Sequence, residues 1–386
     1  MLDIRFPNRV IFSVDASELL HEVLVDFPRP LMVITGANKS RFIHLFEELE
    51  GCVLVESIEG EPTIDQARKL SLRAQANQIR SVVAIGGGSA IDMAKAIAAL
   101  TTNTKDIFHY LEVIGDGSPL TVAPLPICAI PTTSGTGAEM TKNAVLCSPE
   151  HKRKVSLRHE ALLPRIALID PRLTYNSPKN LTFSCGLDAL TQVIEPYISC
   201  KSNFYSDAFA TTAIPLGLES LVTLSKNECA DAREKLSWMS VAGGTALANS
   251  GLGIVHGIAG VLGGWTNISH GLICGALLPH ALMVNETYCK STRFESRFNQ
   301  LRVMIASQLK VEPSIAFESF TDWVNEQLEE FPNQFRLNAQ EIEKVAEEAL
   351  VSSSTRANPI TLPKEAVIHI IKSAGQTPQS LDINTL

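Results

Sequence analysis

The stretch SVVAIGGGSAIDMAKAIAAL, residues 81–100, decides the fold of the first half of the chain. A short apolar run ends at three glycines, and a strong helical pattern follows them directly. Glycine adopts backbone conformations that are closed to other residues and lets a ligand approach the main chain. We therefore predict a strand, a tight turn and a helix, with Ser89 as the helix N-cap and Asp92 completing a variant of the capping box.

The exposed N–H groups at the start of such a helix suit a phosphate group. The stretch departs from the G-x-G-x-x-G dinucleotide motif, however, and a capped glycine-rich turn without a ligand explains it about equally well. A second loop, PTTSGTGAEMT at residues 131–141, follows another apolar run and offers four hydroxyls and two glycines within seven positions. A plain Ser/Thr-rich turn can have this composition too. Two such loops, each after a predicted strand, favour a dinucleotide site.

Apolar runs alternate with helical patterns in the first half of the chain and fade after about residue 180. The runs lie at 31–35, 81–89, 126–131 and 165–170. Strands that alternate with helices indicate a mostly parallel sheet covered on both faces. Long helical patterns then take over, at 186–200, 205–225, 231–249, 296–310, 315–330 and 339–351. We predict an α/β dinucleotide-binding domain over residues 1–180 and an all-helical domain over residues 181–386, joined near 176–184.

The composition argues against several other classes of protein. The 386 residues are 45% hydrophobic and 19% charged, as is usual for soluble globular proteins. A net charge of -8 without a basic run argues against a nucleic-acid partner. The N-terminus lacks the pattern of a secretory signal, and the most apolar stretch, 251–284, is too interrupted for a membrane span. Eight scattered cysteines without a C-x-x-C pair indicate reduced, buried thiols, so we expect a cytoplasmic protein.

Several motifs occur in an order that is typical of one family. They are GGGSAIDMAKAIA (86–98), IPTTSGTGAEMT (130–141), KVSL (154–157), IDP (169–171), GLDALTQVIE (186–195), GLGIVHGIAG (251–260) and NISHGLICGALLPHA (267–281). Together they resemble the iron-containing (group III) alcohol dehydrogenases. The resemblance implies a dehydroquinate synthase-like fold, with a dinucleotide-binding α/β domain and a helical metal-binding domain. It also implies hydride transfer between a nicotinamide cofactor and a small-molecule alcohol or aldehyde, and a possible homodimer, since dimers are usual in that family.

The resemblance also assigns contacts to the cofactor. The implied residues are Gly87, Gly88 and Ser89 at the pyrophosphate, Thr132, Thr133 and Thr136 around the cofactor, Lys154 at the ribose, and Gly36, Asn38, Lys39, Asp92 and Val145 in the same site. For Lys154, which lies in the basic run HKRK, a charge on a solvated loop is the alternative interpretation.

The residues after the apolar run 31–35 bear on the choice of cofactor. Many members of the family carry an aspartate there, which holds the adenosine 2′-hydroxyl and repels a 2′-phosphate. Gly36 takes that position in this chain, and Lys39 and Arg41 follow it. We therefore expect NAD(P)(H) with NADP(H) favoured; the alternative is that both basic side chains face water.

The resemblance implies a divalent metal, Fe2+ or Zn2+, held in the family by one aspartate and three histidines. Asp188, His256 and His270 match three of these ligands, and the two histidines keep the fourteen-residue spacing. Gln192 stands where the first histidine belongs, four residues after Asp188. An amide oxygen is a harder and weaker ligand than imidazole, so we expect weaker metal binding. Gln192 would then be either a ligand or a hydrogen-bond partner of one.

A second departure is Gly260, where many members carry a further histidine proposed to relay protons. Gly260 either enlarges the substrate pocket or allows close helix packing. His280 is interpreted as a structural or pocket-edge histidine. His256 and His270 are the expected catalytic residues, acting through the metal. In a metal-independent enzyme resembling maleylacetate reductase, His256, His270 and Gln192 would instead be hydrogen-bond donors to the substrate. A nucleotide-binding protein that has lost catalysis is the remaining alternative.

Overall fold

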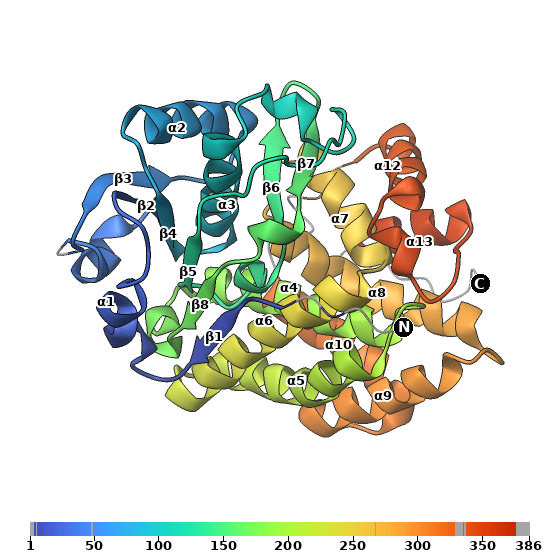
Figure 1. Cartoon of the computed structure of the whole chain (residues 1–386). Helices are drawn as coiled ribbons and strands as arrows, with labels where there is room; N and C mark the ends of the chain where they lie inside the picture. Colours follow the sequence, from blue (N-terminus) through green and yellow to red (C-terminus); the bar gives the residue numbers. More distant parts are fainter. Residues whose placement is uncertain are drawn as a thin grey trace. The chain divides into compact units, whose positions relative to one another are not determined.

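The computed structural model describes residues 4, 6–47, 49–266, 268–328, 335 and 337–375. The chain forms two compact units, Met1–Asn176 and Ser177–Leu386, which are described separately below. The first unit runs from blue to green in Figure 1, and the second from green to red. The division lies within the predicted linker, shortly before the predicted boundary at residue 180. The predicted helical pattern 315–330 and the predicted domain end at 386 extend beyond the described residues.

The first unit is built on a sheet that, within the described residues, has six strands in the order β1-β8-β5-β4-β2-β3. Every neighbouring pair of strands runs parallel, which confirms the predicted mostly parallel sheet. The strands are β1 (Arg9–Phe12), β2 (Leu31–Gly36), β3 (Cys52–Ile58), β4 (Ser81–Gly86), β5 (Ile127–Pro131) and β8 (Ile166–Ile169). The four apolar runs form β2, β4, β5 and β8, whose near-complete burial explains why almost all of their residues are apolar.

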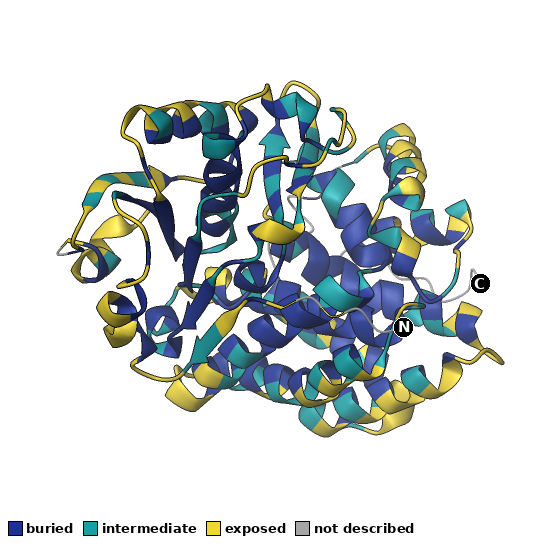
Figure 2. Ribbon diagram, in the orientation of Figure 1, coloured by how far each residue is buried: buried dark blue, intermediate teal, exposed yellow. Residues whose placement is uncertain are grey.

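Alternate side chains of the strands pack on opposite faces of the sheet. Met32 and Ile34 of β2 join the core beneath α2 (Ile64–Ala76) and α3 (Gly88–Thr102), whereas Leu31 and Val33 join the core on the other face. That second core includes residues of the helical turns η1 (Ala16–Leu19) and α1 (Leu20–Val23). The dark blue sheet and α3 in Figure 2 show this burial. An antiparallel hairpin, β6 (Asn143–Ser148) and β7 (Arg153–Arg158), completes the unit.

The predicted N-cap of α3 was wrong. The helix begins at Gly88, and its N-cap is Gly87, with no side chain to cap the first N–H groups. Ser89 therefore lies within the first turn, because the chain turns directly after β4 ends at Gly86. Asp92 does not complete a capping box either; its carboxylate pairs instead with Lys95, one turn further along. The uncapped helix start is left for another hydrogen-bond acceptor.

A buried lysine fastens α3 to the polar loop that follows β5. The Lys95 ammonium is fully buried and donates hydrogen bonds to Ala138 O (2.6 Å), Thr141 Oγ1 (3.0 Å) and Asn143 O (3.0 Å). Its charge opposes the effect of burial on Asp92 and Glu139, yet burial still raises the pKa of Asp92 to about 6 and that of Glu139 to about 7. Burial also lowers the pKa of Lys95 itself.

The pH dependence of the free energy of unfolding should reveal the raised pKa of the buried Glu139 carboxyl group. Burial raises its pKa from 4.5 to about 7, so its contribution to stability is complete below pH 4.5 and is lost as the pH rises to about 7. Glu139→Gln has no proton to lose. As the pH rises between these values, the free energy of unfolding of the variant should therefore increase by roughly 1–3 kcal/mol relative to that of the unmodified chain. Denaturant unfolding at pH 5 and pH 8 measures the difference, and the exposed Glu22→Gln should show none.

The second unit is helical, as predicted for the C-terminal half. Its helices are α4 (Lys179–Ile198), α5 (Phe204–Leu224), α6 (Ala230–Ser250), α7 (Ile254–Trp265), α8 (His270–Cys289), α9 (Glu295–Leu309), α10 (Ala316–Gln327), α12 (Ala339–Val351) and α13 (Lys364–Ala374). The apolar stretch 251–284, for which no helix was predicted, forms α7 and most of α8. Within the described residues no single helix is long and apolar enough to cross a membrane; α6 and α7, bent by 101°, pass that test only as a pair.

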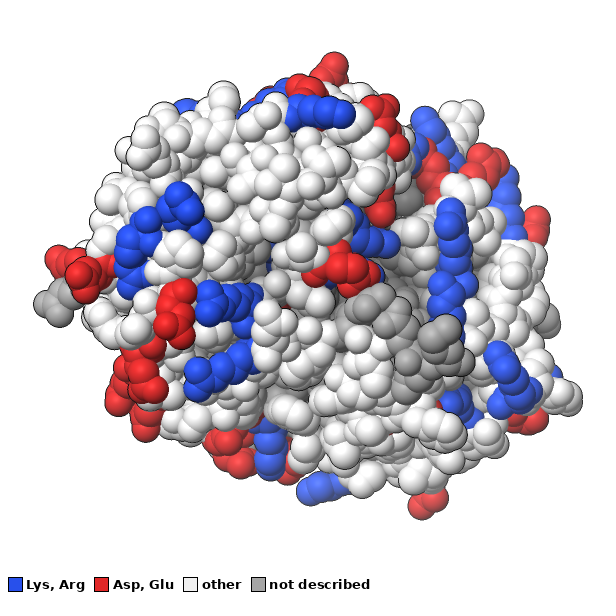
Figure 3. All heavy atoms as spheres, viewed as in Figure 1, with Lys and Arg blue, Asp and Glu red and all other residues white. Residues whose placement is uncertain are grey.

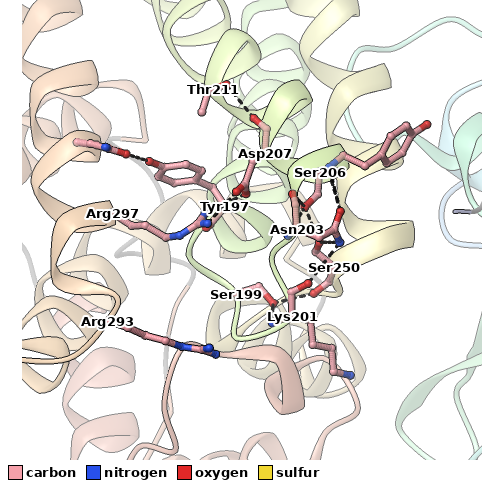
Figure 4. Close-up of polar contacts among 12 residues, drawn as sticks. Tyr197, Ser199, Lys201, Asn203, Ser206, Asp207, Thr211, Ser250, Arg293 and Arg297 are labelled. Carbon is pink, nitrogen blue, oxygen red and sulfur yellow. Dashed lines mark hydrogen bonds and ion pairs between the residues drawn. The ribbon is translucent and has the colours of Figure 1, made fainter. Parts of the chain in front are cut away.

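A polar network fixes the C-terminal end of α4 (Figure 4). Ser199 Oγ donates to Ser250 O at 2.7 Å, which joins the end of α4 to the end of α6. Asn203 caps α5 and also donates to the end of α6. Arg297 of α9 pairs with both carboxylate oxygens of Asp207 and donates to the carbonyl oxygen of Tyr197 at 2.6 Å. The helix that carries the predicted metal ligands Asp188 and Gln192 is therefore anchored to α5, α6 and α9.

The cysteines differ in burial, and the surface carries charges of both signs. All eight cysteines are free thiols; Cys128, Cys274 and Cys289 are buried, and the others are partly exposed, so the prediction of buried thiols applies only to these three. On the face drawn in Figure 3, basic and acidic side chains lie scattered among uncharged ones.

Candidate active site

The glycine loop and the threonine loop contact each other at the carboxyl ends of β4 and β5. The Thr132 N–H donates to Gly86 O at 3.0 Å. A methyl group placed on Gly87 would lie 3.0 Å from Thr133 Oγ1, and one on Gly88 would lie 2.6 Å from Thr136 Oγ1. A side chain at Gly88 would therefore displace Thr136, and one at Gly87 would press on Thr133, because the two loops approach so closely. The structure brings together the predicted cofactor residues of both loops.

The end of β2 adjoins the same place. Gly36 N lies 3.0 Å from the position that a Gly86 Cβ would occupy. The strand order reverses here, since β2 is followed by β3 on one side whereas β4 is followed by β5 on the other. Ligands of parallel α/β sheets bind at such a switch point. Asn38, Lys39 and Arg41 follow β2 and are exposed, and the guanidinium of Arg41 also donates to the carbonyl oxygens of Leu173 and Tyr175.

The hairpin holds the remaining predicted cofactor residues. Lys154 lies on β7 with its side chain only 10% exposed, paired with Glu61 at 2.7 Å. It is therefore not a charge on a solvated loop. Asp92 accepts a hydrogen bond from the backbone of Val145, and the charge of Glu61 contributes to its raised pKa. Asp92, Val145 and the pair Glu61–Lys154 thus form one neighbourhood beside α3.

A cluster of buried ligand-type atoms lies in the second unit. Asp188 of α4, His256 of α7, and His270 and Cys274 of α8 each offer one ligand atom, and these atoms all lie within 4.8 Å of one another. His256 Nε2 is 3.3 Å from Asp188 Oδ1, an ion-pair distance, but the two groups are not aligned for a hydrogen bond. The structure thus brings together the three residues that match the family's ligands, and adds a cysteine that sequence reasoning did not assign.

Gln192 lies one helical turn from Asp188 and is buried. Its Oε1, together with Asp188 Oδ1 and His256 Nε2, is among the buried atoms of the described residues that make no hydrogen bond. Leaving such atoms unsatisfied costs about 1–3 kcal/mol each. Carboxylate oxygen, amide oxygen, imidazole nitrogen and thiol sulfur are all donors to metal ions. The residues present therefore fit a divalent cation.

The electrostatics of the cluster favour positive charge at its centre. Burial raises the pKa of Asp188, but contact with His256 and the charge of His270 outweigh it and lower the pKa below its ordinary value. Burial lowers the pKa of His256, but contact with Asp188 and Glu195 outweighs it and raises the pKa to about 9. Two buried carboxylates thus surround His256, which is the environment that a cation site needs.

Glu195 orients His256, and sequence reasoning missed it. Its buried carboxylate accepts from Val255 N–H at 2.7 Å and from His256 Nδ1–H at 2.7 Å. A carboxylate on Nδ1 fixes the tautomer and leaves Nε2 to bind a cation. The available signal was helical spacing, because Glu195 follows Asp188 by seven residues and Gln192 by three, on one face of α4.

Two glycines let α8 reach α4. A methyl group on Gly271 would lie 2.0 Å from Ser184 O, and one on Gly275 would lie 2.7 Å from Leu187 Cδ1. The two glycines are one helical turn apart, as are His270 and Cys274, which precede them by one residue each. The close contact therefore places both ligand-type side chains of α8 near Asp188.

Two further predictions were tested by the structure. Packing does not require glycine at 260, since a methyl group on Gly260 would meet nothing within 4 Å, so the reading of close helix packing was wrong. His280 is buried, and burial together with the nearby His369 lowers its pKa to about 4. An imidazole that stays neutral in a buried position fits the structural interpretation of His280.

A mostly parallel α/β unit and a helical unit that carries a cluster of ligand-type side chains define the class of fold to which the chain can be compared. The chain matches the model described as "Iron-containing alcohol dehydrogenase" over residues 7–171 and "Fe-containing alcohol dehydrogenase family, C-terminal" over residues 182–375. It is 36% identical over 306 residues to alcohol dehydrogenase 4 of Saccharomyces cerevisiae, covering 78% of this chain and 77% of that protein. It is 31% identical over 302 residues to the NAD-dependent methanol dehydrogenase of Bacillus methanolicus, covering 76% and 77%.

A solved structure of a 1,3-propanediol oxidoreductase superposes with a TM-score of 0.82 at 26% identity, covering 97% of this chain and 100% of that one. The chain belongs to the iron-containing alcohol dehydrogenase family. It is an oxidoreductase that acts on alcohols, as an alcohol dehydrogenase or aldehyde reductase.

Replacing Glu195 should weaken cation binding without removing a ligand. Glu195→Gln has one acceptor oxygen where two hydrogen bonds must be accepted, so either Val255 N–H or His256 Nδ1–H loses its partner. We expect the affinity for Zn2+ to fall about 10- to 100-fold, as is usual when a hydrogen-bond partner of a ligand is lost. Competition with a chromophoric chelator measures it. Glu219→Gln, on the half-exposed glutamate beside Lys235, is the control, and equal affinities of both variants would contradict the role of Glu195.

Proposed function

We propose that the chain is an NAD(P)(H)-dependent, metal-assisted alcohol dehydrogenase or aldehyde reductase. The observation that carries the proposal is the cluster of Asp188, His256 and His270, in which the buried atoms Asp188 Oδ1 and His256 Nε2 converge without a hydrogen bond among the described residues. The cluster occurs in a chain whose other unit presents two phosphate-type loops in mutual contact. The cofactor supplies the hydride chemistry, and the protein supplies binding, orientation and charge.

The first unit would hold the cofactor through its backbone. The N-cap Gly87 leaves the N–H groups at the start of α3 without a side-chain partner, and an anionic pyrophosphate is stabilised at such a helix start. Thr132, Thr133 and Thr136 offer hydroxyls beside it, and Lys95 keeps their loop attached to α3. Lys154, which forms an ion pair with Glu61, would reach the ribose.

The second unit would hold the metal. Asp188 supplies negative charge, and His256 and His270 supply imidazole nitrogen, with the His256 ring held by Glu195. A divalent ion bound there supplies Lewis acidity toward the oxygen of an alcohol or aldehyde. Residue 260 is glycine, with open space beside it, and so offers no imidazole to relay a proton. The proton of the alcohol would therefore leave through water, a hydroxyl or the ribose.

The cofactor preference is proposed to be for NADP(H). No acidic side chain occurs from Gly36 to Arg41, and Lys39 is exposed beside the end of β2. A 2′-phosphate would meet no repulsion there and one nearby cation. The relative from Bacillus methanolicus is NAD-dependent, so both cofactors belong in the assay.

An aspartate at position 36 should reverse this preference. A side chain at Gly36 meets nothing within 4 Å, so Gly36→Asp should leave the fold intact. The new carboxylate would repel a 2′-phosphate and accept from a 2′-hydroxyl. We expect kcat/KM for NADPH relative to NADH to fall by at least roughly tenfold, equivalent to about 1.4 kcal/mol. Gly36→Asn, which is neutral and similar in size, is the matched control; an unchanged ratio in Gly36→Asp would place the adenosine ribose elsewhere.

Removal of metal should abolish activity. The protein is dialysed against a chelator, its metal content is measured, and reduction of an aldehyde panel is followed by NADH and NADPH absorbance. Activity should fall with metal content and return with Fe2+ or Zn2+. Full activity in a verified metal-free preparation would instead support the metal-independent enzyme in which His256 and His270 polarise the carbonyl group. Bound cofactor without turnover of any substrate would support a chain that has lost catalysis.

A further inference from the structure

Cys274 is the member of the buried cluster that the metal ligands of the family do not include. It lies on α8 one helical turn after His270 and is fully buried. Its Sγ is 3.6 Å from His270 Nε2 and belongs to the group of ligand atoms within 4.8 Å of one another. The thiol therefore shares its surroundings with Asp188 and His256, whose acceptor atoms make no hydrogen bond with the described residues.

We propose that the Cys274 thiolate is a protein ligand of the metal and replaces the histidine that is absent at position 192. The proposal rests on the metal site of the proposed function. On binding, the thiol releases its proton to solvent and Sγ donates an electron pair to the ion, with no change of oxidation state. The set of four protein ligands then becomes Asp188, His256, His270 and Cys274.

Gln192 is the competing candidate for the fourth ligand. Its side chain lies beside the carboxylate of Asp188 and helps to lower the pKa of that group, as a residue that supports a ligand would. As a neutral amide it is also a weaker donor to a metal than a thiolate. Gln192 comes from the same helix as Asp188, whereas Cys274 comes from the helix that carries His270 and is held against α4 by Gly271 and Gly275. The close packing of α8 thus delivers two ligands instead of one.

A thiolate among the ligands changes which metal ions the site is expected to prefer. A set of one aspartate, two histidines and an amide would favour harder ions than the family's set does. Thiolate is soft and common in zinc sites, including catalytic ones that combine cysteine with histidine. We therefore expect the site to bind Zn2+ and Co2+ much more tightly than Mn2+ and Mg2+, in spite of the glutamine at position 192.

Cobalt spectroscopy of the full chain tests the proposal. Metal is removed with a chelator, and Co2+ is added up to one equivalent. A cysteine ligand gives a near-ultraviolet thiolate-to-Co2+ charge-transfer band, which imidazole, carboxylate and amide do not give. The band should be present in the unmodified protein and in Cys289→Ser, whose cysteine is equally buried on the same helix. It should be absent in Cys274→Ser, which should also bind Zn2+ at least about 10- to 100-fold more weakly.

Other outcomes overturn the proposal in distinguishable ways. Stoichiometric Co2+ binding without the band, or a band that persists in Cys274→Ser, excludes Cys274 as a ligand and leaves the proposed function intact. Unchanged Zn2+ affinity in Cys274→Ser, together with a loss of about 10- to 100-fold in Gln192→Ala, would make Gln192 the fourth ligand. Failure of the unmodified protein to bind either ion would remove the metal site and the metal-assisted function together.

Protection of the thiol provides a second measurement that needs no variant. The unmodified protein is treated with iodoacetamide after mild denaturant has opened it partially, with and without Zn2+, and labelling is located by mass spectrometry. Zn2+ should protect Cys274 and leave Cys289 unchanged. Equal labelling of Cys274 in both samples would contradict the proposal.

Discussion

The carboxylate of Glu195 is the constraint on which the second unit depends. One of its oxygens accepts from the backbone of Val255 and the other from the ring of His256, so it fixes both the start of α7 and the direction of the imidazole. A buried carboxylate is costly unless its partners are well placed. Here the partners are supplied by the start of α7, which approaches α4 so closely that a methyl group on Gly253 would lie 2.7 Å from Glu195 Oε1. The ligand cluster is therefore part of the core rather than an addition to it.

In the first unit, a buried charged group, the ammonium of Lys95, likewise holds the candidate site together. Gly87 and Gly88 let the threonine loop lie against the start of α3. Lys95 fastens that loop with hydrogen bonds to Ala138 O and Thr141 Oγ1, and it also donates to Asn143 O at the start of β6. The buried ammonium and its two acidic neighbours are expensive to desolvate, but they hold two loops from different strands in one position. Rigid placement of backbone donors is what a pyrophosphate site requires, because such donors bind well only when they need not move.

Four strands of the sheet were predictable because strands buried on both faces are mostly apolar, as β2 and β4 are apart from Thr35 and Ser81. Most of the long helices were predictable from their spacing. The helices α7 and α8 were not, because α8 contains Pro279 and both are rich in glycine, which lowers the local signal for a helix. The cap at Ser89 was assigned wrongly because an uncapped glycine start has no side-chain signature. Asp188, His256 and His270 were found through their spacing within family motifs, and the structure places them together.

By itself, the sequence determined the class of fold, the residue types that can bind a phosphate and a metal, and the unusual presence of glutamine at position 192. Only the tertiary structure decided which of these residues meet. Glu195 was visible only as one more acid and Cys274 as one more thiol. The structure places Glu195 against His256 at the start of α7, and the packing of α8 on α4 places Cys274 beside Asp188 and His256. The physical reason is that ligand sites join residues far apart in the chain, and their contacts are set by how closely helices can approach. In this protein glycines at 271 and 275 set that approach.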